Sequence, residues 1–223
     1  MIKWLEDAVF YEVYPQSFRD SNGDGIGDIP GITEKLEYIQ ELGCNALWIN
    51  PCFTSPFYDA GYDVEDYYSV APRYGTNEDL KKLFEAAHQR GMHVLLDLVP
   101  GHTAVTHPWF QESMKAEKNE YTDRYVWTDS LYKRMEDVKG IVSVLRGISP
   151  RPASCGVNCF STQPALNYGF ANITDAGWQQ PTDAPGPMAT REELKNIMRF
   201  WLTLGCDGFR VDMAGSLVKN DED

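Results

Sequence analysis

The sequence predicts an α/β fold built on a parallel sheet, because one pattern recurs three times along its 223 residues. In each copy an amphipathic helix ends at a glycine and is followed by a short apolar strand that runs into polar residues. Strands that alternate with helices in this way form parallel sheets with right-handed crossovers. The copies are GITEKLEYIQELG before CNALWINP, TNEDLKKLFEAAHQRG before MHVLLDLVP, and TREELKNIMRFWLTLG before CDGFRVDM.

The three predicted helices carry recognisable signals along their length. The first places four apolar residues on one face, and the other two begin with capping boxes, in which a Thr and an acidic residue three positions later bind the backbone. All three end at a glycine that can adopt positive φ. The apolar face comprises Ile32, Leu36, Ile39 and Leu42, and the capping pairs are Thr76 with Asp79 and Thr190 with Glu193.

The order of elements suggests an inserted subdomain. An additional strand at Ala8 to Tyr14 precedes the first helix, so the chain begins with three strands and two helices in alternation. Residues 101–188 then break the rhythm with aromatic, Gly and Pro residues. We therefore expect sheet strands one to three in residues 1–100, an inserted subdomain in 101–188, and the third helix with strand four in 189–223.

Composition excludes several classes of protein. The formal charge is −13, and the 20 Lys and Arg residues form no basic run, which argues against a nucleic-acid partner. No stretch of about 18 apolar residues suggests a membrane span, and the N-terminus lacks the pattern of a signal peptide, so a cytoplasmic location is expected. The odd number of cysteines, five, does not indicate a disulfide framework. Cys155 and Cys159 alone are weak evidence for zinc, which normally takes four ligands.

Polar residues stand where the predicted strands end, and chemistry on parallel β/α sheets is found at that edge. They are Asn50 after the second strand, Asp97 and His102 after the third, and Arg210 with Asp212 on the fourth. Because Arg210 and Asp212 are two positions apart, their side chains would share one face of a strand. A structural ion pair is the simpler explanation of GFRVD alone.

Several ordered motifs resemble the α-amylase superfamily (glycoside hydrolase family 13), especially the branch with oligo-1,6-glucosidase, α-glucosidase and sucrose isomerase. The similar segments are AVFYEVYPQSFRDSNGDGIGDIPGI, DLVPGH with HPWF after it, QPALN and GFRVD. The resemblance implies a TIM (β/α)8 barrel with a subdomain inserted after strand three. It also implies that this chain is the N-terminal half, truncated after the first four βα units.

The resemblance assigns roles to five residues. Asp212 would be the nucleophile, Arg210 would hold it ionised, and His102 would hydrogen-bond the sugar at the cleavage point. Asp59 and Tyr62 in DAGYD match the pair that closes the sugar-binding end in exo-acting members. Two partners are expected. One is a small α-glucoside, which would be a disaccharide or a short oligosaccharide, and the other is the C-terminal half of the barrel.

The chemistry of the residue types agrees with a retaining mechanism through a covalent glucosyl-enzyme intermediate. Such a mechanism needs an anionic nucleophile and a second carboxylate about 5 to 5.5 Å away that protonates the leaving oxygen. A neighbouring guanidinium lowers the pKa of a carboxyl group, as a nucleophile requires. After Asp212 only a polar tail, Asp221 to Asp223, carries carboxylates, so we expect an α-glucosidase or transglucosidase fragment that is inactive alone. A non-catalytic carbohydrate-binding or transporter-associated protein of the same fold is the alternative.

One loop has the pattern of a structural Ca²⁺ or Mg²⁺ site. Oxygen ligands alternate around a tight glycine turn, which suits a hard cation. An EF-hand is excluded because Gly31 stands where its bidentate Glu is required. An unoccupied loop closed by Asx turns is the alternative. The expected ligands are Asp20, Asn22, Asp24, the Ile26 carbonyl and Asp28.

No other cofactor is expected. Many α-amylases bind a calcium ion between barrel and inserted domain, using an Asn before the motif histidine and an Asp in the QPDLN-like motif. The matching residues here are Gly101 and Ala165, which have no side-chain oxygen. The resemblance therefore implies that the interdomain calcium is absent, and no organic cofactor is expected either.

Overall fold

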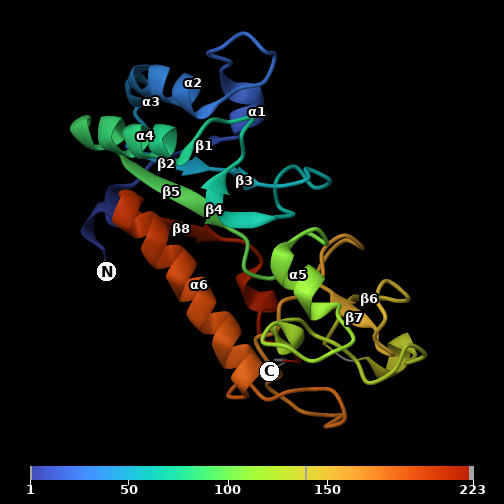
Figure 1. The fold of residues 1–223 in the computed structure, drawn as a ribbon. Coiled ribbons are helices and arrows are strands. Elements are labelled where there is room, and N and C mark those ends of the chain that lie inside the picture. Colours follow the sequence, from blue (N-terminus) through green and yellow to red (C-terminus); the bar gives the residue numbers. More distant parts are fainter. Residues whose placement is uncertain (1, 139, 221–223) are drawn as a thin grey trace. The chain divides into compact units, whose positions relative to one another are not determined.

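The computed structural model describes residues 2–138 and 140–220, and the chain divides into two compact units. Figure 1 labels the helices and strands of both. The sheet unit comprises Met1–Thr54, Asp66–Leu98 and Ile197–Val211. The insert unit comprises Ser55–Glu65, Val99–Asn196 and Asp212–Asp223.

A four-stranded parallel sheet forms the centre of the sheet unit, as predicted. The strand order is β1-β2-β5-β8, and every neighbouring pair is parallel. Val13 of β1 and most apolar side chains of β2 and β5 are buried, which is typical of parallel sheets with helical crossovers. The strands are β1 (Phe10–Val13), β2 (Ala46–Ile49), β5 (His93–Leu98) and β8 (Gly208–Val211).

The first predicted helix is in fact two short helices, α2 (Ile29–Glu34) and α3 (Leu36–Glu41). The backbone leaves the helical conformation at Lys35, with φ −105° and ψ 8°. The predicted apolar face does not extend to its last residue, because Leu42 is the C-cap of α3 and is 54% exposed. A 3-10 helix (Lys3–Asp7) precedes β1, and a one-turn helix, α1 (Pro15–Phe18), follows it.

Helix α4 (Asn77–Gln89) begins with the predicted capping box. The Asp79 N–H donates to Thr76 Oγ1 at 3.2 Å, and the Thr76 N–H donates to Asp79 Oδ2 at 3.0 Å. The glycines that follow α3, α4 and α6 all have positive φ, as expected for helix ends: 86° at Gly43, 70° at Gly91 and 116° at Gly205.

The second predicted capping box, Thr190 with Glu193, is wrong. Helix α6 (Pro185–Leu204) begins five residues before Thr190, because Pro185 supplies the fixed φ that favours the first helical position. Thr190 therefore lies inside the helix, where its hydroxyl donates to the Gly186 carbonyl at 3.1 Å.

An antiparallel hairpin that the sequence pattern did not predict follows β2. Its strands are β3 (Phe53–Thr54) and β4 (Asp66–Val70). Trp201 of α6 packs on it within the sheet unit, with its ring stacked 5.1 Å from Phe53 and its Nε1–H donating to the Tyr67 carbonyl at 2.8 Å.

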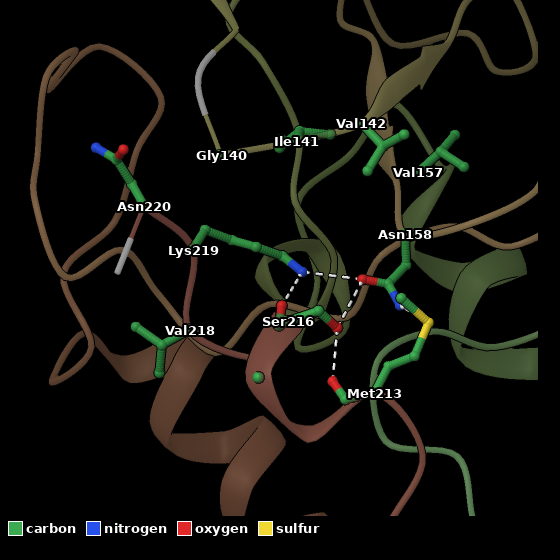
Figure 2. Close-up of a pocket in the computed structure, with 11 residues that line it drawn as sticks. Gly140, Ile141, Val142, Val157, Asn158, Met213, Ser216, Val218, Lys219 and Asn220 are labelled. Carbon is green, nitrogen blue, oxygen red and sulfur yellow. Dashed lines mark hydrogen bonds between the residues drawn. The ribbon is translucent and has the colours of Figure 1, made fainter. Parts of the chain in front are cut away.

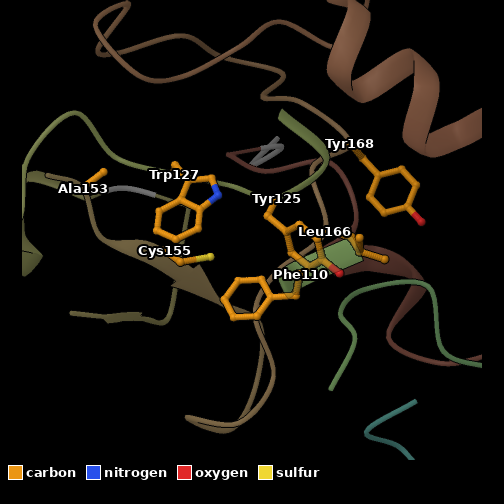
Figure 3. Close-up of a cluster of buried hydrophobic side chains, with 7 residues drawn as sticks. All are labelled: Phe110, Tyr125, Trp127, Ala153, Cys155, Leu166 and Tyr168. Carbon is orange, nitrogen blue, oxygen red and sulfur yellow. The ribbon is translucent and has the colours of Figure 1, made fainter. Parts of the chain in front are cut away.

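The insert unit has little regular structure and its own hydrophobic core. It contains α5 (Pro108–Ser113), the hairpin of β6 (Ser143–Leu145) and β7 (Cys155–Val157), and three 3-10 helices, Thr122–Arg124, Met135–Asp137 and Ala214–Ser216. Figure 3 shows the core cluster, which comprises Phe110, Tyr125, Trp127, Ala153, Cys155, Leu166 and Tyr168.

The cysteines of the insert unit do not form a pair. Cys155 lies in the core cluster, where burial raises the pKa of its thiol far above the ordinary value, whereas Cys159 is exposed. A thiol kept protonated by burial is a poor metal ligand, because metals bind the thiolate.

The two units divide the chain differently from the expected boundaries at residues 101–188 and 189–223. Residues 55–65 belong to the insert unit, where the Ala104 N–H donates to the Val64 carbonyl at 2.8 Å. The segment after β8 belongs there too, because Lys219 exchanges backbone hydrogen bonds with Gly169 and Ala171, each 2.9 Å long. Asp221, Glu222 and Asp223 lie outside the described residues. Within the described chain, no helix combines the length and hydrophobicity needed to cross a membrane.

The capping box of α4 gives the first prediction. Replacing Thr76 with Ala removes the oxygen that accepts the Asp79 N–H, so the free energy of unfolding should fall by about 1 kcal/mol. The matched control is Thr203→Ala, an exposed α6 residue that bonds the Arg199 carbonyl and caps nothing; it should change stability by less than about 0.5 kcal/mol. Urea denaturation followed by tryptophan fluorescence measures both, and equal losses would contradict the capping role.

Candidate active site

The insert unit brings together four of the predicted site residues, with His102 at the centre. Its imidazole is 2% exposed, and its Nε2 lies 3.0 Å from the Tyr62 carbonyl oxygen. Burial lowers the pKa of His102; the Tyr62 carbonyl and the carboxylates of Asp212, Asp59 and Asp63 raise it, but burial dominates. A neutral imidazole therefore lies within electrostatic reach of three acids.

The loop that carries Asp59 and Tyr62 is wound around the carboxylate of Asp63. This fully buried carboxylate accepts hydrogen bonds from the Ser55 hydroxyl at 3.0 Å and from the backbone N–H groups of Tyr58 at 2.8 Å and Asp59 at 3.1 Å. The sequence prediction did not include Asp63, although it is the second acid of the DAGYD motif. Buried polar groups of this kind stabilise one loop conformation, because an unpaired carboxylate would be costly.

The same loop holds two non-glycine residues in the left-handed region. The φ angles are 61° at Phe57 and 53° at Ala60. Such conformations cost of order 1 kcal/mol or more and are concentrated at functional sites, where the surroundings must enforce them. The three bonds to Asp63 supply that enforcement.

Gln163 positions Asp59 from a second segment. Its Nε2–H donates to Asp59 Oδ2 at 2.6 Å, and its Oε1 accepts the Phe160 N–H at 2.9 Å. Gln163 is fully buried and is the first residue of QPALN. The motif was recognised from the sequence, but its connection to Asp59 was not, because the two residues are far apart in the chain.

Asp212 follows the end of β8 by one residue. The next residue, Met213, has φ 46° and begins the 3-10 helix Ala214–Ser216. The strand therefore ends in a sharp turn directly after the candidate nucleophile.

Arg210 belongs to the sheet unit, where it has partners of its own. Its Nη1 lies 3.2 Å from both carboxylate oxygens of Asp97, and its guanidinium lies 4.8 Å from the centre of the Trp48 ring. Trp48 Nε1–H donates to the same Asp97 at 3.0 Å. Asp97 therefore accepts from two side chains and holds Arg210 in place, while the effect of Arg210 on Asp212 stays a prediction.

A polar cluster continues from His102 into a pocket of about 210 Å³ within the insert unit (Figure 2). Asn158 Nδ2 lies 3.2 Å from His102 Nδ1, and Asn158 Oδ1 accepts a hydrogen bond from Lys219 Nζ at 3.1 Å. The Lys219 ammonium also donates to the Ser216 carbonyl. Lys219 is 5% exposed, and burial lowers its pKa to about 8. Neither Asn158 nor Lys219 was predicted from the sequence.

The predicted metal loop is closed by Asx turns. Asp20 accepts backbone N–H groups of Gly23 at 2.6 Å and Gly25 at 2.8 Å, and these contacts hold its pKa below the ordinary value. The side chains of Asn22 and Asp24 each accept a hydrogen bond from the backbone N–H of the residue two positions later. Asp28 caps α2 through the Gly31 N–H at 2.7 Å and binds the Ser21 hydroxyl at 2.8 Å. No three His, Cys, Asp or Glu side chains among the described residues converge as a metal-binding group.

The comparisons with known proteins decide the family. Residues 12–223 match the model of the alpha amylase catalytic domain. The chain belongs to the α-amylase family. It is 38% identical over 219 residues to an oligo-1,6-glucosidase of Bacillus sp. (strain F5), covering 98% of this chain and 40% of that protein. It is 42% identical over 224 residues to the trehalose synthase/amylase TreS of Mycolicibacterium smegmatis, covering 98% and 35%.

Solved structures of the family have the same fold. The trehalulose synthase MutB of Pseudomonas mesoacidophila superimposes with a TM-score of 0.79 at 38% identity, covering 94% of this chain and 35% of that one. The isomaltulose synthase of Erwinia rhapontici, crystallised with sucrose, gives 0.78 at 36% identity, covering 94% and 35%. The parallel β/α units of this α-amylase family chain are therefore part of a TIM barrel, as predicted, and the chain spans 40% or less of the length of these relatives.

Lys219 gives a prediction about pH. Its folded pKa, about 8, is below the unfolded value of 10.5, so the folded state binds fewer protons between these values and stability should rise with pH across that window. Below pH 8 the buried charge should lower the free energy of unfolding by on the order of 3 kcal/mol compared with its value above pH 10.5. We expect wild type to gain stability relative to Lys219→Met between pH 8 and 10, measured by urea denaturation. A difference between the two proteins that does not change with pH would contradict the buried ammonium.

Proposed function

We propose that this chain carries the nucleophile side of a retaining enzyme acting on short α-glucosides. The observation that supports the proposal best is the buried, neutral His102, which lies within electrostatic reach of Asp212 and Asp59. A glucosyl group bound there would meet an anionic nucleophile, an uncharged hydrogen-bond donor and a carboxylate for its hydroxyl groups.

Each side chain has a distinct role in this proposal. The Asp212 carboxylate attacks the anomeric carbon and forms the glucosyl ester, while Arg210 helps to keep it ionised. His102 would share with a sugar hydroxyl the Nε2–H that it directs at the Tyr62 carbonyl, and a neutral ring does not compete with the sugar for the Asp212 anion. Asp59, held by Gln163, accepts hydrogen bonds from hydroxyl groups at the end of the site, and the Tyr62 ring packs against the sugar.

The acid/base carboxylate is not assigned to any described residue. Besides Asp212, the acids that raise the pKa of His102 are Asp59 and Asp63. Asp59 is bonded to Gln163, and Asp63 accepts three hydrogen bonds from its own loop. Both carboxylates therefore hold the loop in place, whereas a general acid must reach the leaving oxygen of the substrate. We infer that these 223 residues alone do not turn over unactivated glucosides.

The names of the relatives support the substrate class. They include an oligo-1,6-glucosidase, a trehalose synthase/amylase and an isomaltulose synthase in complex with sucrose. Glucosidase and synthase names of this kind are consistent with a nucleophile that forms a glucosyl intermediate. We propose a disaccharide or short oligosaccharide as the glucosyl donor.

Covalent trapping tests the nucleophile. A 5-fluoro-α-glucosyl fluoride has a leaving group that needs no acid catalyst, so incubation should add one glucosyl mass to the chain, and peptide mapping should place it on Asp212. Asp212→Asn should take up no label, whereas Asp129→Asn, a change at a half-exposed acid of the insert unit, should label like wild type. The unmodified chain should release no glucose from maltose, isomaltose or sucrose.

Other outcomes of this experiment would redirect the proposal. A label on a different residue, or equal labelling of Asp212→Asn, would overturn the role of Asp212. Turnover of maltose by the 223-residue chain would overturn the inference about the missing acid. Saturable binding of maltose without any label would favour a non-catalytic carbohydrate-binding protein.

We also propose one structural Ca²⁺ or Mg²⁺ in the loop from Asp20 to Asp28. Supporting it are the all-oxygen ligand set and the turns of the loop at Gly23 and Gly25, which both have positive φ. When bound, the ion would cross-link the loop and take no part in the chemistry. We propose no interdomain calcium, because Gly101 faces the Asn158 amide, where a Cβ would lie 2.5 Å from Nδ2, and Lys219 already supplies a positive charge to Asn158.

The metal proposal predicts a thermal shift. After treatment with a chelator, addition of Ca²⁺ or Mg²⁺ should raise the melting temperature, by an amount that corresponds to about 2.7 kcal/mol at one hundred times Kd. Asp24→Asn keeps the Asx-turn acceptor but removes a charge, so it should weaken the shift, whereas Asp137→Asn, at an exposed ion pair, should not. Melting temperatures that do not respond to either ion would contradict the site.

A further inference from the structure

The side chain of Asn158 offers the site a hydrogen-bond donor on one side and an acceptor on the other. Its Oδ1 lies 3.1 Å from Lys219 Nζ (Figure 2), and its Nδ2 lies 3.2 Å from His102 Nδ1. The second Nδ2 hydrogen points to Met213 Sδ at 4.0 Å. These contacts lie within the insert unit, and Asn158 is 4% exposed.

Lys219 decides which way this amide faces. A lysine ammonium only donates hydrogen bonds, so the atom of Asn158 that faces it must be the carbonyl oxygen. Rotating the amide by half a turn would place the amide N–H donors against the ammonium donors inside the protein. Leaving buried donors without an acceptor costs more free energy than an ordinary hydrogen bond contributes. The Ser216 hydroxyl is a weaker constraint, because its short bond goes to the Met213 carbonyl at 2.8 Å while Asn158 Oδ1 is 3.4 Å away.

The direction of the amide then fixes the hydrogens of His102. Because the Asn158 amide nitrogen faces His102 Nδ1, that ring nitrogen must accept and carries no hydrogen. On the other side of the ring, Nε2 faces the Tyr62 carbonyl at 3.0 Å, which only accepts. The ring must therefore carry its hydrogen on Nε2.

We propose that Asn158, oriented by Lys219, is a positioning residue that locks His102 in the neutral Nε2–H tautomer. The meaning of this lock for catalysis rests on the proposed function, since that site requires an uncharged imidazole of fixed orientation within electrostatic reach of Asp212. The lock itself is a property of the chain and can be measured without any sugar.

Nitrogen NMR of the imidazoles tests the proposal in the 223-residue chain. Long-range proton–nitrogen spectra of the histidine-labelled chain distinguish the two tautomers and the imidazolium, and the sequence has only four histidines to assign. In wild type at pH 7 we expect His102 as a single Nε2–H tautomer. In Asn158→Asp an acceptor replaces the donor, so His102 should gain a hydrogen on Nδ1 and become an imidazolium.

Lys219→Met is the second variant. Without the ammonium, the Asn158 amide can turn, so His102 nitrogen signals should shift toward values averaged over both tautomers. Lys219→Arg, which restores a donor, should move them back. Lys195→Met, at an exposed ion pair of α6, is the matched control and should leave His102 unchanged.

His107 reports in every variant whether the insert unit is folded. Its Nδ1 accepts the Trp109 N–H at 3.1 Å, so its own tautomer is fixed independently and should stay constant. With His107 unchanged, an Nδ1–H tautomer in wild type, or identical His102 signals in wild type, Asn158→Asp and Lys219→Met, would overturn the proposal. Because no glucoside is present, failure of the glucosidase function would leave these results as they are.

Discussion

The candidate site depends on one constraint, which is that a buried imidazole needs a partner for each of its two nitrogens. His102 meets it with the Tyr62 carbonyl on one side and the Asn158 amide on the other. Desolvation keeps the ring neutral although three carboxylates act to raise its pKa. The segments that supply these groups are far apart in the sequence, so the requirements of one ring connect the DAGYD loop, the DLVPGH segment and the residue that follows β7.

The regular part of the fold was predictable because its signals are local. Helix and strand periods and terminal glycines predicted the parallel sheet, and the Thr76 box predicted where α4 begins. The break at Lys35, the early start of α6 at Pro185 and the short hairpin at β3 were not predicted. Tertiary packing and proline geometry decide those features, and the periodic pattern does not report them.

The candidate site was predictable only as far as the motifs reach. Resemblance to a family pointed to Asp59, Tyr62, His102 and Asp212, which the insert unit brings together around His102. The residues that hold them are buried polar side chains outside or at the edge of those motifs: Asp63, Gln163, Asn158 and Lys219. Their roles come from long-range pairing, and a buried amide or lysine has no local sequence signal that separates it from an exposed one.

The central claim is that Asp212, His102, Asp59 and Tyr62 form one binding site for a glucosyl group. Titration calorimetry of the 223-residue chain with the glucose-configured iminosugar 1-deoxynojirimycin measures it most directly. The account predicts binding of one iminosugar per chain, lost in His102→Ala and in Asp59→Ala and much weaker for the galactose-configured isomer. Equal binding of both isomers, or binding that survives both substitutions, would contradict it.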